Sequence, residues 1–298
     1  MPSPAERSGR ALAVIGDIVE DVVVWLDEPI RPATDTASRV FRARGGSGAN
    51  VAALAAASWP TRFIGCVGRD AAGDALAAEL ARHGVDARLQ RTGSTGTVVL
   101  LVDTEGERTM FPDRGAAGLL DAVDPAWLDG IAHLHAPSYG FAGEPMRSAV
   151  LDALHVARST GASLSIDASS TGLINALGVD ACLQRLADIA PDYLIANAEE
   201  SALLGIRPGR SLPVPERTVV IVKNGPRPTA ILRGTDVTHV AVPPVTGIRD
   251  LTGAGDAFAA GFLTALLGGA SPEVACLSGH GRAASVLASP GASTRSAV

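Results

Sequence analysis

The run from Asp250 to Phe258, DLTGAGDAF, has the residue types and spacing best suited to chemistry. It leads into a helix pattern, because Phe258, Phe262 and Leu266 recur at intervals of four residues. Glycines ahead of a helix leave its first N–H groups unpaired at the positive end of the helix dipole, and this attracts an anion such as phosphate. Asp256 falls in the first turn, where its carboxylate either caps the helix or accepts a proton from an attacking hydroxyl.

A second glycine cluster, GGSGAN from Gly45 to Asn50, precedes another helix pattern. Its spacing is not the G-x-G-x-x-G of dinucleotide-binding loops, and the sequence contains no G-x-x-x-x-G-K-[ST] loop. The glycines allow a close approach of the backbone to a ligand, and the Asn50 amide offers both a donor and an acceptor to a polyhydroxylated molecule. Asn50 would serve equally well as a helix cap.

A third cluster, NAEE from Asn197 to Glu200, follows the strand predicted over residues 193–196. Ligand groups in α/β sheets commonly lie at the ends of strands. Asn197 and Glu200 are three residues apart and can share a helix face. A Glu in the first helical turn is also favoured by the dipole, so capping explains the pair as well as ligand binding does.

Short β-branched runs alternate with Ala-rich helical stretches along the chain. A helix is predicted over Ala71 to His83, where Leu76 and Leu80 lie four residues apart and Gly84 follows as a stop signal. This alternation predicts an α/β fold in which helices cover a mostly parallel sheet. The predicted strands are residues 11–15, 62–67, 98–103, 164–167, 193–196 and 219–223.

Other segments break this alternation. Residues 21–26 and 36–44 are strand-like and follow the first strand with no helix between them. Residues 97–111 stay extended beyond the length of an ordinary strand. We predict that these segments form a small sheet that projects from the main one and acts as a lid.

The strand predicted over residues 21–26 is apolar on both faces, with Val22 and Val24 on one side and Val23 and Trp25 on the other. A projecting sheet of this kind must be covered by the active site of its own chain or by the lid of a partner. We therefore predict a homodimer formed through the lids.

Composition excludes several classes of partner. The 298 residues include 25 basic and 31 acidic side chains, which give a net charge of −6. Because no run of Lys or Arg exceeds two residues, we expect neither a nucleic acid nor a membrane surface as a partner. The three cysteines, Cys66, Cys182 and Cys276, have no C-x-x-C spacing, which argues against a disulfide framework and a zinc site. With no signal-peptide pattern and no apolar run long enough to span a bilayer, we expect a cytoplasmic protein.

Taken together, the motifs resemble those of the ribokinase-like (PfkB) family of carbohydrate kinases. The resemblance covers nearly the full chain, and it rests on GGSGANVA with Asn50 and on the late D-x-T-G-A-G-D-A-F run. Between them, in the family's order, stand FIGCVGRDAAGDALAAELARHGVD, the GERT turn at Gly106 to Thr109, and NAEE. The resemblance implies a three-layer α/β/α fold, ribokinase-like, formed by residues 1–298 as a single domain. Lid strands are then expected at about residues 20–45 and 97–114.

Members of that family transfer the γ-phosphoryl group of ATP to a hydroxymethyl group of a sugar or sugar derivative. By resemblance, Asp256 is the catalytic base, and the backbone N–H groups of Gly253, Ala254 and Gly255 form an anion hole. Phosphoryl transfer passes through a loose and highly charged transition state, so positioning and charge stabilisation should supply most of the catalysis.

The resemblance also implies contacts to the acceptor substrate. Four positions match the family's substrate contacts, namely Asp21, Gly45, Gly46 and Asn50. Arg114, on the predicted lid, would meet a carboxylate or phosphate of the substrate, although a surface ion pair explains it as well. Asp17 is expected to serve the turn after the first strand.

On the nucleotide side, the matching positions are Asn197, Lys223, Gly225 and His280. Glu200 matches the residue that organises Mg²⁺ through water. His280 would also fit a structural role, since it is a lone histidine on an Ala-rich helix. For a monovalent cation, with K⁺ as the candidate, the matching positions are Asp250, Thr252, Ser289, Gly291 and Ser293.

Two departures from the family's pattern bear on specificity. Ser47 replaces a Lys of the ribokinases, which weakens ribose as the first guess for the substrate. Pro226 and Pro228 flank Arg227 where the family usually has a second glycine, so the loop over the phosphates must differ.

Two alternative functions remain. A nucleoside kinase of the same fold would stack the base of its substrate on lid aromatics, for which Trp25, Phe41 and Phe111 are available. A non-catalytic ligand-binding relative is disfavoured, because Asp256 and all three anion-hole residues are present.

Overall fold

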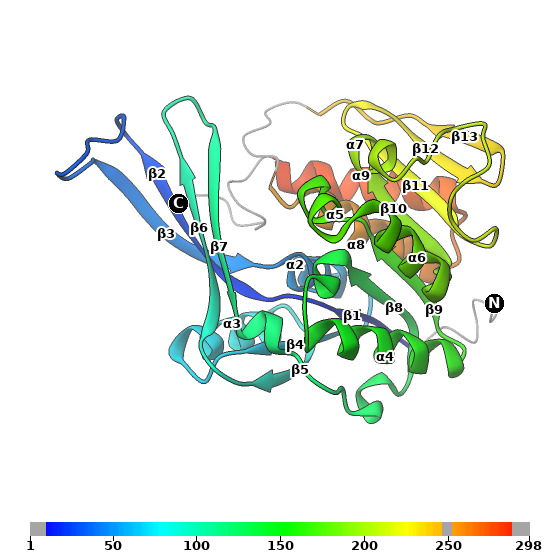
Figure 1. Ribbon diagram of the computed structural model, residues 1–298, viewed down its shortest axis with the longest axis horizontal. Coiled ribbons are helices and arrows are strands. Elements are labelled where there is room, and N and C mark those ends of the chain that lie inside the picture. Colours follow the sequence, from blue (N-terminus) through cyan, green and yellow to red (C-terminus); the bar gives the residue numbers. More distant parts are fainter. Residues whose placement is uncertain (1–9, 246–251, 288–298) are drawn as a thin grey trace.

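A central sheet forms the middle layer of the molecule, with nine strands in the order β13-β12-β11-β10-β9-β8-β1-β4-β5 (Figure 1). The structure is a computed structural model that describes residues 10–245 and 252–287. The seven strands from β5 to β11 in that order run parallel, whereas β12 and β13 are added antiparallel at one edge. The strands are β1 Ala11–Ile15, β4 Thr61–Val67, β5 Asp86–Arg91, β8 Ile131–Pro137, β9 Ser163–Asp167, β10 Tyr193–Asn197, β11 Val219–Asn224, β12 Arg227–Arg233 and β13 Asp236–Val240.

Helices cover both faces of this sheet, and each face has its own apolar core. On one face lie α2 Ser47–Ala56, α3 Ala71–Arg82, α8 Ala254–Leu267 and α9 Pro272–Leu287. On the other lie α4 Met146–Ser159, α5 Thr171–Leu177 and α6 Val179–Ile189, while the short α7 Ala198–Leu203 follows β10. Three 3₁₀ turns complete the described elements, at Ala116–Leu119, Pro125–Leu128 and Ser138–Phe141. The three-layer α/β/α prediction is confirmed.

A separate four-stranded sheet, in the order β3-β2-β6-β7, projects from one side of the body (Figure 1, left). Its strands are β2 Val19–Leu26, β3 Ser38–Gly45, β6 Thr95–Val102 and β7 Arg108–Gly115. We call this sheet the lid. On one of its faces Val23, Leu100 and Val102 form a small apolar cluster of their own.

The extended stretch of residues 97–111 lies in the lid. It includes residues 98–103, which also follow the strand–helix alternation of the main sheet, and it is a pair of antiparallel strands, β6 and β7. They are joined by a turn at Asp103, whose carboxylate accepts hydrogen bonds from the N–H groups of Glu105 and Glu107. Gly106 supplies the left-handed backbone, with φ of +86°, that this turn requires.

The sequence prediction missed β8, which lies next to β1 at the middle of the sheet. Its sequence, IAHLHAP, has few β-branched residues and two histidines, so it lacks the usual strand signal. Both imidazoles are nevertheless buried, because the Ser165 hydroxyl on β9 lies 2.7 Å from His133 Nε2 and from His135 Nδ1. Pairing of this kind offsets part of the penalty of burying polar rings, and His135 Nε2 is left without a hydrogen-bond partner among the described residues.

The predicted helix over 71–83 is α3, and its N-cap residue connects it to the lid. The Asp70 carboxylate accepts from the N–H of Gly73 at 2.9 Å and from the N–H of Thr95, at the start of β6, at 2.7 Å. Asp70 therefore caps α3 and fixes the base of a lid strand with the same side chain.

Two further observations concern the whole of the described chain. Cys66, Cys182 and Cys276 are free thiols, as the sequence predicted. None of the helices in residues 10–245 and 252–287 is long and apolar enough to cross a membrane.

Candidate active site

A cleft of about 1240 Å³ lies between the lid and the carboxyl ends of the parallel strands. Asp17 follows β1, Asp167 ends β9 and Lys223 lies near the end of β11, so the central sheet supplies charged groups to one wall. Val98 and Leu100 of β6 contribute to an apolar wall on the lid side. The position is where ligands bind in open α/β sheets. The volume exceeds the roughly 300–1,000 Å³ of an ordinary small-molecule site.

The Asp256 carboxylate is held in this cleft by two side chains of α2. Ser47 Oγ donates to Asp256 Oδ1 at 2.7 Å, and Asn50 Nδ2 donates to Asp256 Oδ2 at 2.9 Å. Helix α8 has no side-chain cap, so Asp256 does not play the capping role that the sequence left open. Burial raises the pKa of Asp256 to about 6, although the hydrogen bonds from Ser47 and Asn50 oppose this shift.

The N-terminus of α8 faces the same cleft. Its N-cap residue, Gly253, has left-handed backbone with φ of +75°. Lys223 Nζ lies 3.4 Å from the point where a Cβ on Gly255 would stand, so the ammonium group is directly beside the first turn. Lys223 also pairs with Asp167, with Nζ 3.2 Å from Oδ2. A helix N-terminus and a lysine together form a local anion site.

Lys223 is enclosed, and burial alone would lower the pKa of its ammonium group. The carboxylates of Asp167 and Glu200 outweigh that effect and raise it. The ammonium group therefore stays protonated beside Gly255 over the whole physiological range.

The substrate positions predicted from the sequence meet at the base of the lid. A Cβ on Gly45 would stand 2.0 Å from Asp21 Oδ1, so only glycine leaves room for that carboxylate. Gly46 has φ of +92°, and a Cβ there would stand 2.6 Å from the carbonyl oxygen of Asp17. Asp17 does serve the turn, because its Oδ1 accepts from the N–H of Gly48 at 3.2 Å, and it also lines the cleft.

The Asp21 carboxylate, on β2, lines the cleft. Burial raises its pKa to about 7, and the negative charges of Asp17 and Asp256 add to the shift, whereas the Arg44 cation opposes it. Three carboxylates therefore converge at this end of the cleft, and Asp21 is protonated in part at neutral pH.

Arg44 is a residue of this site that the sequence analysis missed. Its guanidinium is buried, donates through Nη1 to Asn50 Oδ1, and pairs through Nε with Glu79 Oε1 of α3 at 3.4 Å. The available signal was an arginine directly before Gly45 and Gly46 at the end of a strand.

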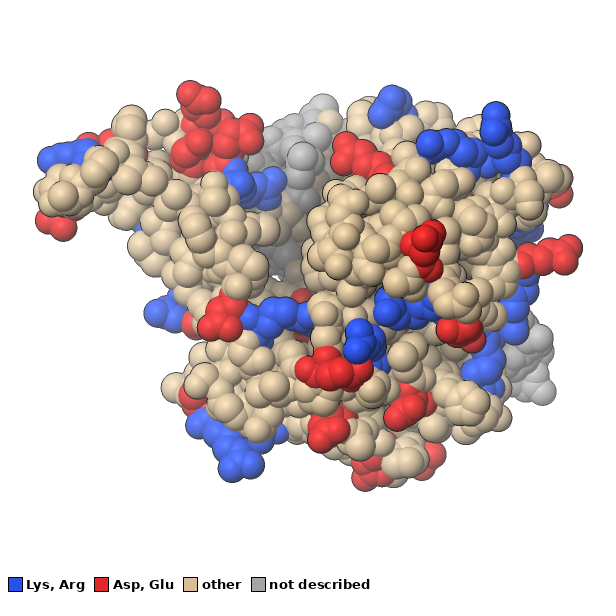
Figure 2. Space-filling view, viewed as in Figure 1, with Lys and Arg blue, Asp and Glu red and all other residues tan. Residues whose placement is uncertain are grey.

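The lid contributes two arginines to the cleft. Arg114 has no carboxylate partner among residues 10–245 and 252–287, and its Nη2 contacts Met146 Sδ at 3.5 Å, so the surface ion pair is not formed. Arg108 donates to Thr252 Oγ1, which joins β7 to the residue just ahead of α8. Over the face in Figure 2, basic side chains are interspersed with acidic ones.

Asn197 and Glu200 form a capping box at the start of α7. Asn197 Oδ1 accepts from the N–H of Glu200 at 2.8 Å, and Glu200 Oε2 accepts from the N–H of Asn197 at 2.8 Å. Both residues also line the cleft. Burial raises the pKa of Glu200, and the nearby Asp167 carboxylate adds to the shift.

The other two predicted nucleotide positions, Gly225 and His280, also line the cleft. Gly225, with φ of +58°, forms the turn between β11 and β12 together with Pro226, and both line the cleft. His280 Nε2 lies 3.0 Å from Thr229 Oγ1, and its ring packs edge-on against Phe258. Burial lowers the pKa of His280, so the imidazole is neutral at pH 7. His280 therefore has structural contacts and also a place in the cleft wall.

Several predicted cation ligands cannot be compared with the structure. Of these positions only Thr252 is described, while Asp250, Ser289, Gly291 and Ser293 lie outside the described residues. Within residues 10–245 and 252–287, no group of three or more His, Cys, Asp or Glu side chains is arranged to hold a metal ion.

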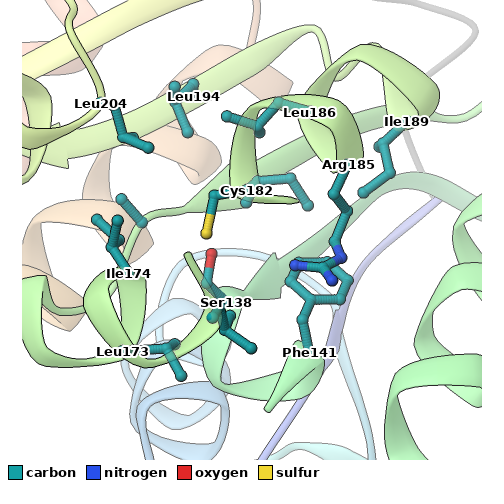
Figure 3. A pocket seen from close by; sticks show the side chains of 13 residues that line it. Ser138, Phe141, Leu173, Ile174, Cys182, Arg185, Leu186, Ile189, Leu194 and Leu204 are labelled. Atoms are coloured by element: carbon teal, nitrogen blue, oxygen red, sulfur yellow. The ribbon is translucent and has the colours of Figure 1, made fainter. Parts of the chain in front are cut away.

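A second cavity, of about 20 Å³, lies beneath the turn Ser138–Phe141 (Figure 3). Its lining is mainly apolar and comes from α5, α6 and the neighbouring strands, with Cys182 at one side. The Arg185 guanidinium lies over the Phe141 ring, 5.2 Å from its centroid. A cavity of this volume holds about one water molecule at most, so it is a packing gap and not a substrate site.

Comparisons with known proteins agree with the fold described above. The sequence matches the description "pfkB family carbohydrate kinase" over residues 10–297. A fructokinase of Klebsiella pneumoniae is 32% identical over 279 residues, which cover 87% of this chain and 85% of that protein. A nucleoside kinase of Methanothermobacter thermautotrophicus is 29% identical over 294 residues, or 94% of this chain and 88% of that protein. Among solved structures, adenosine kinase from Sinorhizobium meliloti shares the fold with a TM-score of 0.84 at 20% identity, over 97% of each chain.

Proposed function

The chain belongs to the pfkB family of carbohydrate kinases, and we propose that it transfers the γ-phosphoryl group of ATP to a hydroxymethyl group of a sugar or sugar derivative. One observation carries this proposal. The Asp256 carboxylate, fixed by Ser47 and Asn50, lies one turn from the uncapped N-terminus of α8, within the cleft between lid and sheet. A base and an anion site are then side by side, as phosphoryl transfer requires.

In the proposed mechanism, the acceptor hydroxyl donates its proton to Asp256 as its oxygen attacks the γ-phosphorus. The bond from phosphorus to the bridging oxygen breaks, and ADP is the leaving group. The first N–H groups of α8, at Gly253, Ala254 and Gly255, face the charge that develops on the transferred phosphoryl oxygens. Lys223 adds a fixed positive charge beside them, so these donors need little reorganisation in the transition state.

The residues present fit a nucleotide with Mg²⁺. The absence of a side chain at Gly255 leaves space beside Lys223 Nζ for a phosphate group. A Cβ there would stand 3.4 Å from Nζ and narrow this space. Mg²⁺, when bound, neutralises charge on the phosphates. We assign Glu200 to hold it through water, because its carboxylate is already engaged with Asn197 and Mg²⁺ retains its water ligands readily. Gly225 and His280 are assigned to the wall beside the nucleotide, and K⁺ remains a prediction.

On the acceptor side, the Asp21 carboxylate offers acceptors to sugar hydroxyls, and Arg114 supplies a cation to an acidic group of the substrate. The Asn50 amide does not line the cleft, and its contacts to Arg44 and Asp256 give it an indirect part on this side. None of the three lid aromatics that a nucleoside kinase was expected to use lines the cleft. Phe111 shares a face with Val99, opposite to the cleft-lining Val98. Neither Trp25 nor Phe41 lines the cleft, and this favours a sugar as the acceptor.

The proposal is tested by measuring acceptor-dependent ADP formation with ATP and Mg²⁺ against a panel of sugars, sugar acids and nucleosides. We expect turnover with at least one sugar or sugar derivative, well above the rate without an acceptor. Turnover restricted to nucleosides would show that the acceptor is a nucleoside and not a sugar. No turnover with any member would favour a non-catalytic ligand-binding protein.

We also propose that the active form is a homodimer joined through the lids. Two cross-strand rows on the lid face opposite to the cleft are mostly apolar, each with one polar residue at one end, Arg42 or Thr109. The apolar residues of one row are Phe111, Val99 and Val22, and those of the other are Leu101, Val24 and Val40. Phe111 and Val40 are 56% and 60% exposed in the single chain, so a second lid would remove much apolar surface from water.

Phe111→Glu is expected to convert the dimer into a monomer, because it places a charge on the apolar face that the partner would cover. Light scattering at micromolar concentration provides the measurement. Leu277→Glu is the matched control, since this exposed leucine lies on α9, away from the lid, and its replacement should leave the dimer intact. A monomeric unmodified protein, or a dimer that survives Phe111→Glu, would contradict this arrangement.

A further inference from the structure

Arg44 is a buried cation at the end of the lid strand β3, with its side chain only 4% exposed. A buried charge is tolerated when it is paired and hydrogen-bonded, and loss of one partner leaves the other uncompensated. The neighbours of Arg44 come from α2, from α3 and, through one intervening side chain, from α8.

The contacts of Arg44 form a relay to Asp256. Arg44 Nη1 donates to Asn50 Oδ1, and Asn50 Nδ2 donates in turn to Asp256 Oδ2 at 2.9 Å. On its other side Arg44 Nε lies 3.4 Å from Glu79 Oε1, which supplies the counter-charge. The Asn50 amide therefore links the guanidinium to the carboxylate in this relay.

An asparagine amide has one acceptor atom and one donor group, and here both are committed. Arg44 can only donate, so it requires Oδ1 on its side and leaves Nδ2 facing the carboxylate. Without Arg44, the Oδ1 atom would lose its partner, and nothing in the relay would fix the plane of the amide. The donor to Asp256 Oδ2 would then lose its fixed direction.

The electrostatic surroundings support the same conclusion. Arg44 attracts Glu79, Asp256 and Asp21, and its charge lowers the pKa of Asp21. The charged groups that act on Asp256 or Asp21 come from four parts of the fold, namely Asp17 and Asp21 at β1–β2, Arg44 on β3, Asp167 on β9 and Lys223 on β11. Glu79 on α3 faces Arg44. On the acceptor side of the cleft, Arg44 is the cation of this set.

We propose that Arg44 is a positioning residue for phosphoryl transfer, which holds the Asp256 carboxylate toward the acceptor by fixing the Asn50 amide, with Glu79 as its counter-ion. This inference rests on the proposed function of Asp256. Two hydrogen bonds, from Arg44 to Asn50 and from Asn50 to Asp256, then connect the lid strand β3 to the base.

The test compares Arg44→Gln, Glu79→Gln and Arg39→Gln by kcat and by the pH profile of kcat/KM for the best acceptor. Arg39 is the matched control, because it lies on the same strand with a side chain that is 70% exposed. In Arg44→Gln we expect kcat to fall by about 10- to 100-fold, the effect of a misplaced reacting group. The acid limb should move up by about one pH unit, because a neighbouring cation is lost.

Glu79→Gln should move the acid limb in the opposite direction, to lower pH, because it removes a negative charge and leaves Arg44 in place. Arg44→Lys keeps the charge, so its acid limb should return to the wild-type pH while kcat recovers in part. A merely structural role for Arg44 would not produce opposite shifts in these two variants. If Arg44→Gln does not fold, the Lys variant and Glu79→Gln still provide both readouts.

Two results would overturn the inference. One is an Arg44→Gln variant with the same kcat and pH profile as Arg39→Gln. The other is an acid limb that stays in place in both Glu79→Gln and Arg44→Gln. Asp256→Asn, assayed in parallel, separates this failure from that of the proposed function, because retained turnover in Asp256→Asn would refute the base itself.

Discussion

Asp256→Asn is expected to lower kcat with the best acceptor by about 10²–10⁴-fold, the usual contribution of a positioned general base. The carboxamide cannot accept the hydroxyl proton, while the anion site at the start of α8 stays intact. KM for ATP should change little, since Asp256 contacts Ser47 and Asn50 and not the nucleotide wall. Steady-state kinetics with both substrates varied provides the measurement.

The same variant should fold at least as well as the wild type. The carboxamide oxygen of the new side chain can accept from Asn50 Nδ2, and its nitrogen can donate to Ser47 Oγ, so both present contacts persist. Burial raises the pKa of Asp256 to about 6, so the ionised carboxylate destabilises the fold above that pH, and the penalty fades as the pH falls toward 4. We therefore expect a gain of about 1–3 kcal/mol at pH 8, measured by denaturant unfolding.

A variant that folds and keeps wild-type turnover would remove Asp256 from the chemistry. A variant that unfolds would contradict the prediction that the new carboxamide keeps the hydrogen bonds to Ser47 and Asn50. Catalysis and stability are thus expected to move in opposite directions at this position, which is typical of a group held in an unfavourable state for function.

The pH dependence should be steep on the acid side. The pKa of Asp21 is raised to about 7 and that of Asp256 to about 6, and both carboxylates must be ionised for the acceptor to bind and react. Protonation of the first weakens binding of the hydroxyls, and protonation of the second removes the base. Between pH 8 and pH 5, kcat/KM should fall by roughly 10³-fold, with a slope approaching two below pH 6.

Asp21→Asn separates the two ionisations. It should reduce affinity for the acceptor and leave one acid limb near pH 6, with a slope of one. A profile for the wild type that stays flat from pH 8 to pH 5 would contradict the burial of both carboxylates. A slope of two that persists in Asp21→Asn would assign the second ionisation to another group.

Local patterns predicted much of the fold, because five of the seven parallel strands and α3 follow from hydrophobic spacing and turn signals, whereas β5, β8, β12 and β13 were not predicted. The exceptions have physical reasons. Strand β8 was missed because its two histidines, His133 and His135, are not typical of a buried strand. Both contact the Ser165 hydroxyl on β9, and local sequence does not show this pairing. Residues 98–103 fit both the strand–helix alternation and the predicted lid, since alternation of apolar residues does not tell which sheet a strand joins, and in the structure they lie in the lid.

For the candidate site, the sequence proposed residues but not their partners. Asp256 and Asn50 were both candidates, and the structure excludes the cap for Asp256 and brings these residues, 206 positions apart, to 2.9 Å. The role of Asp256 as base stays a proposal. Arg44 and Glu79 were missed because their pairing depends on how β3 packs near α3. The capping explanation for Asn197 and Glu200 was correct for their contacts, and their proposed role toward the nucleotide is additional.

The central claim is that the cleft transfers phosphate from ATP to a sugar hydroxyl with Asp256 as the base. Phosphorus-31 NMR of a reaction with ATP, Mg²⁺ and the best acceptor from the panel tests it most directly. We predict a new phosphate monoester resonance that grows in step with ADP and is lost in Asp256→Asn. Growth of inorganic phosphate with ADP, and no ester, would show ATP hydrolysis in place of transfer and would contradict the account.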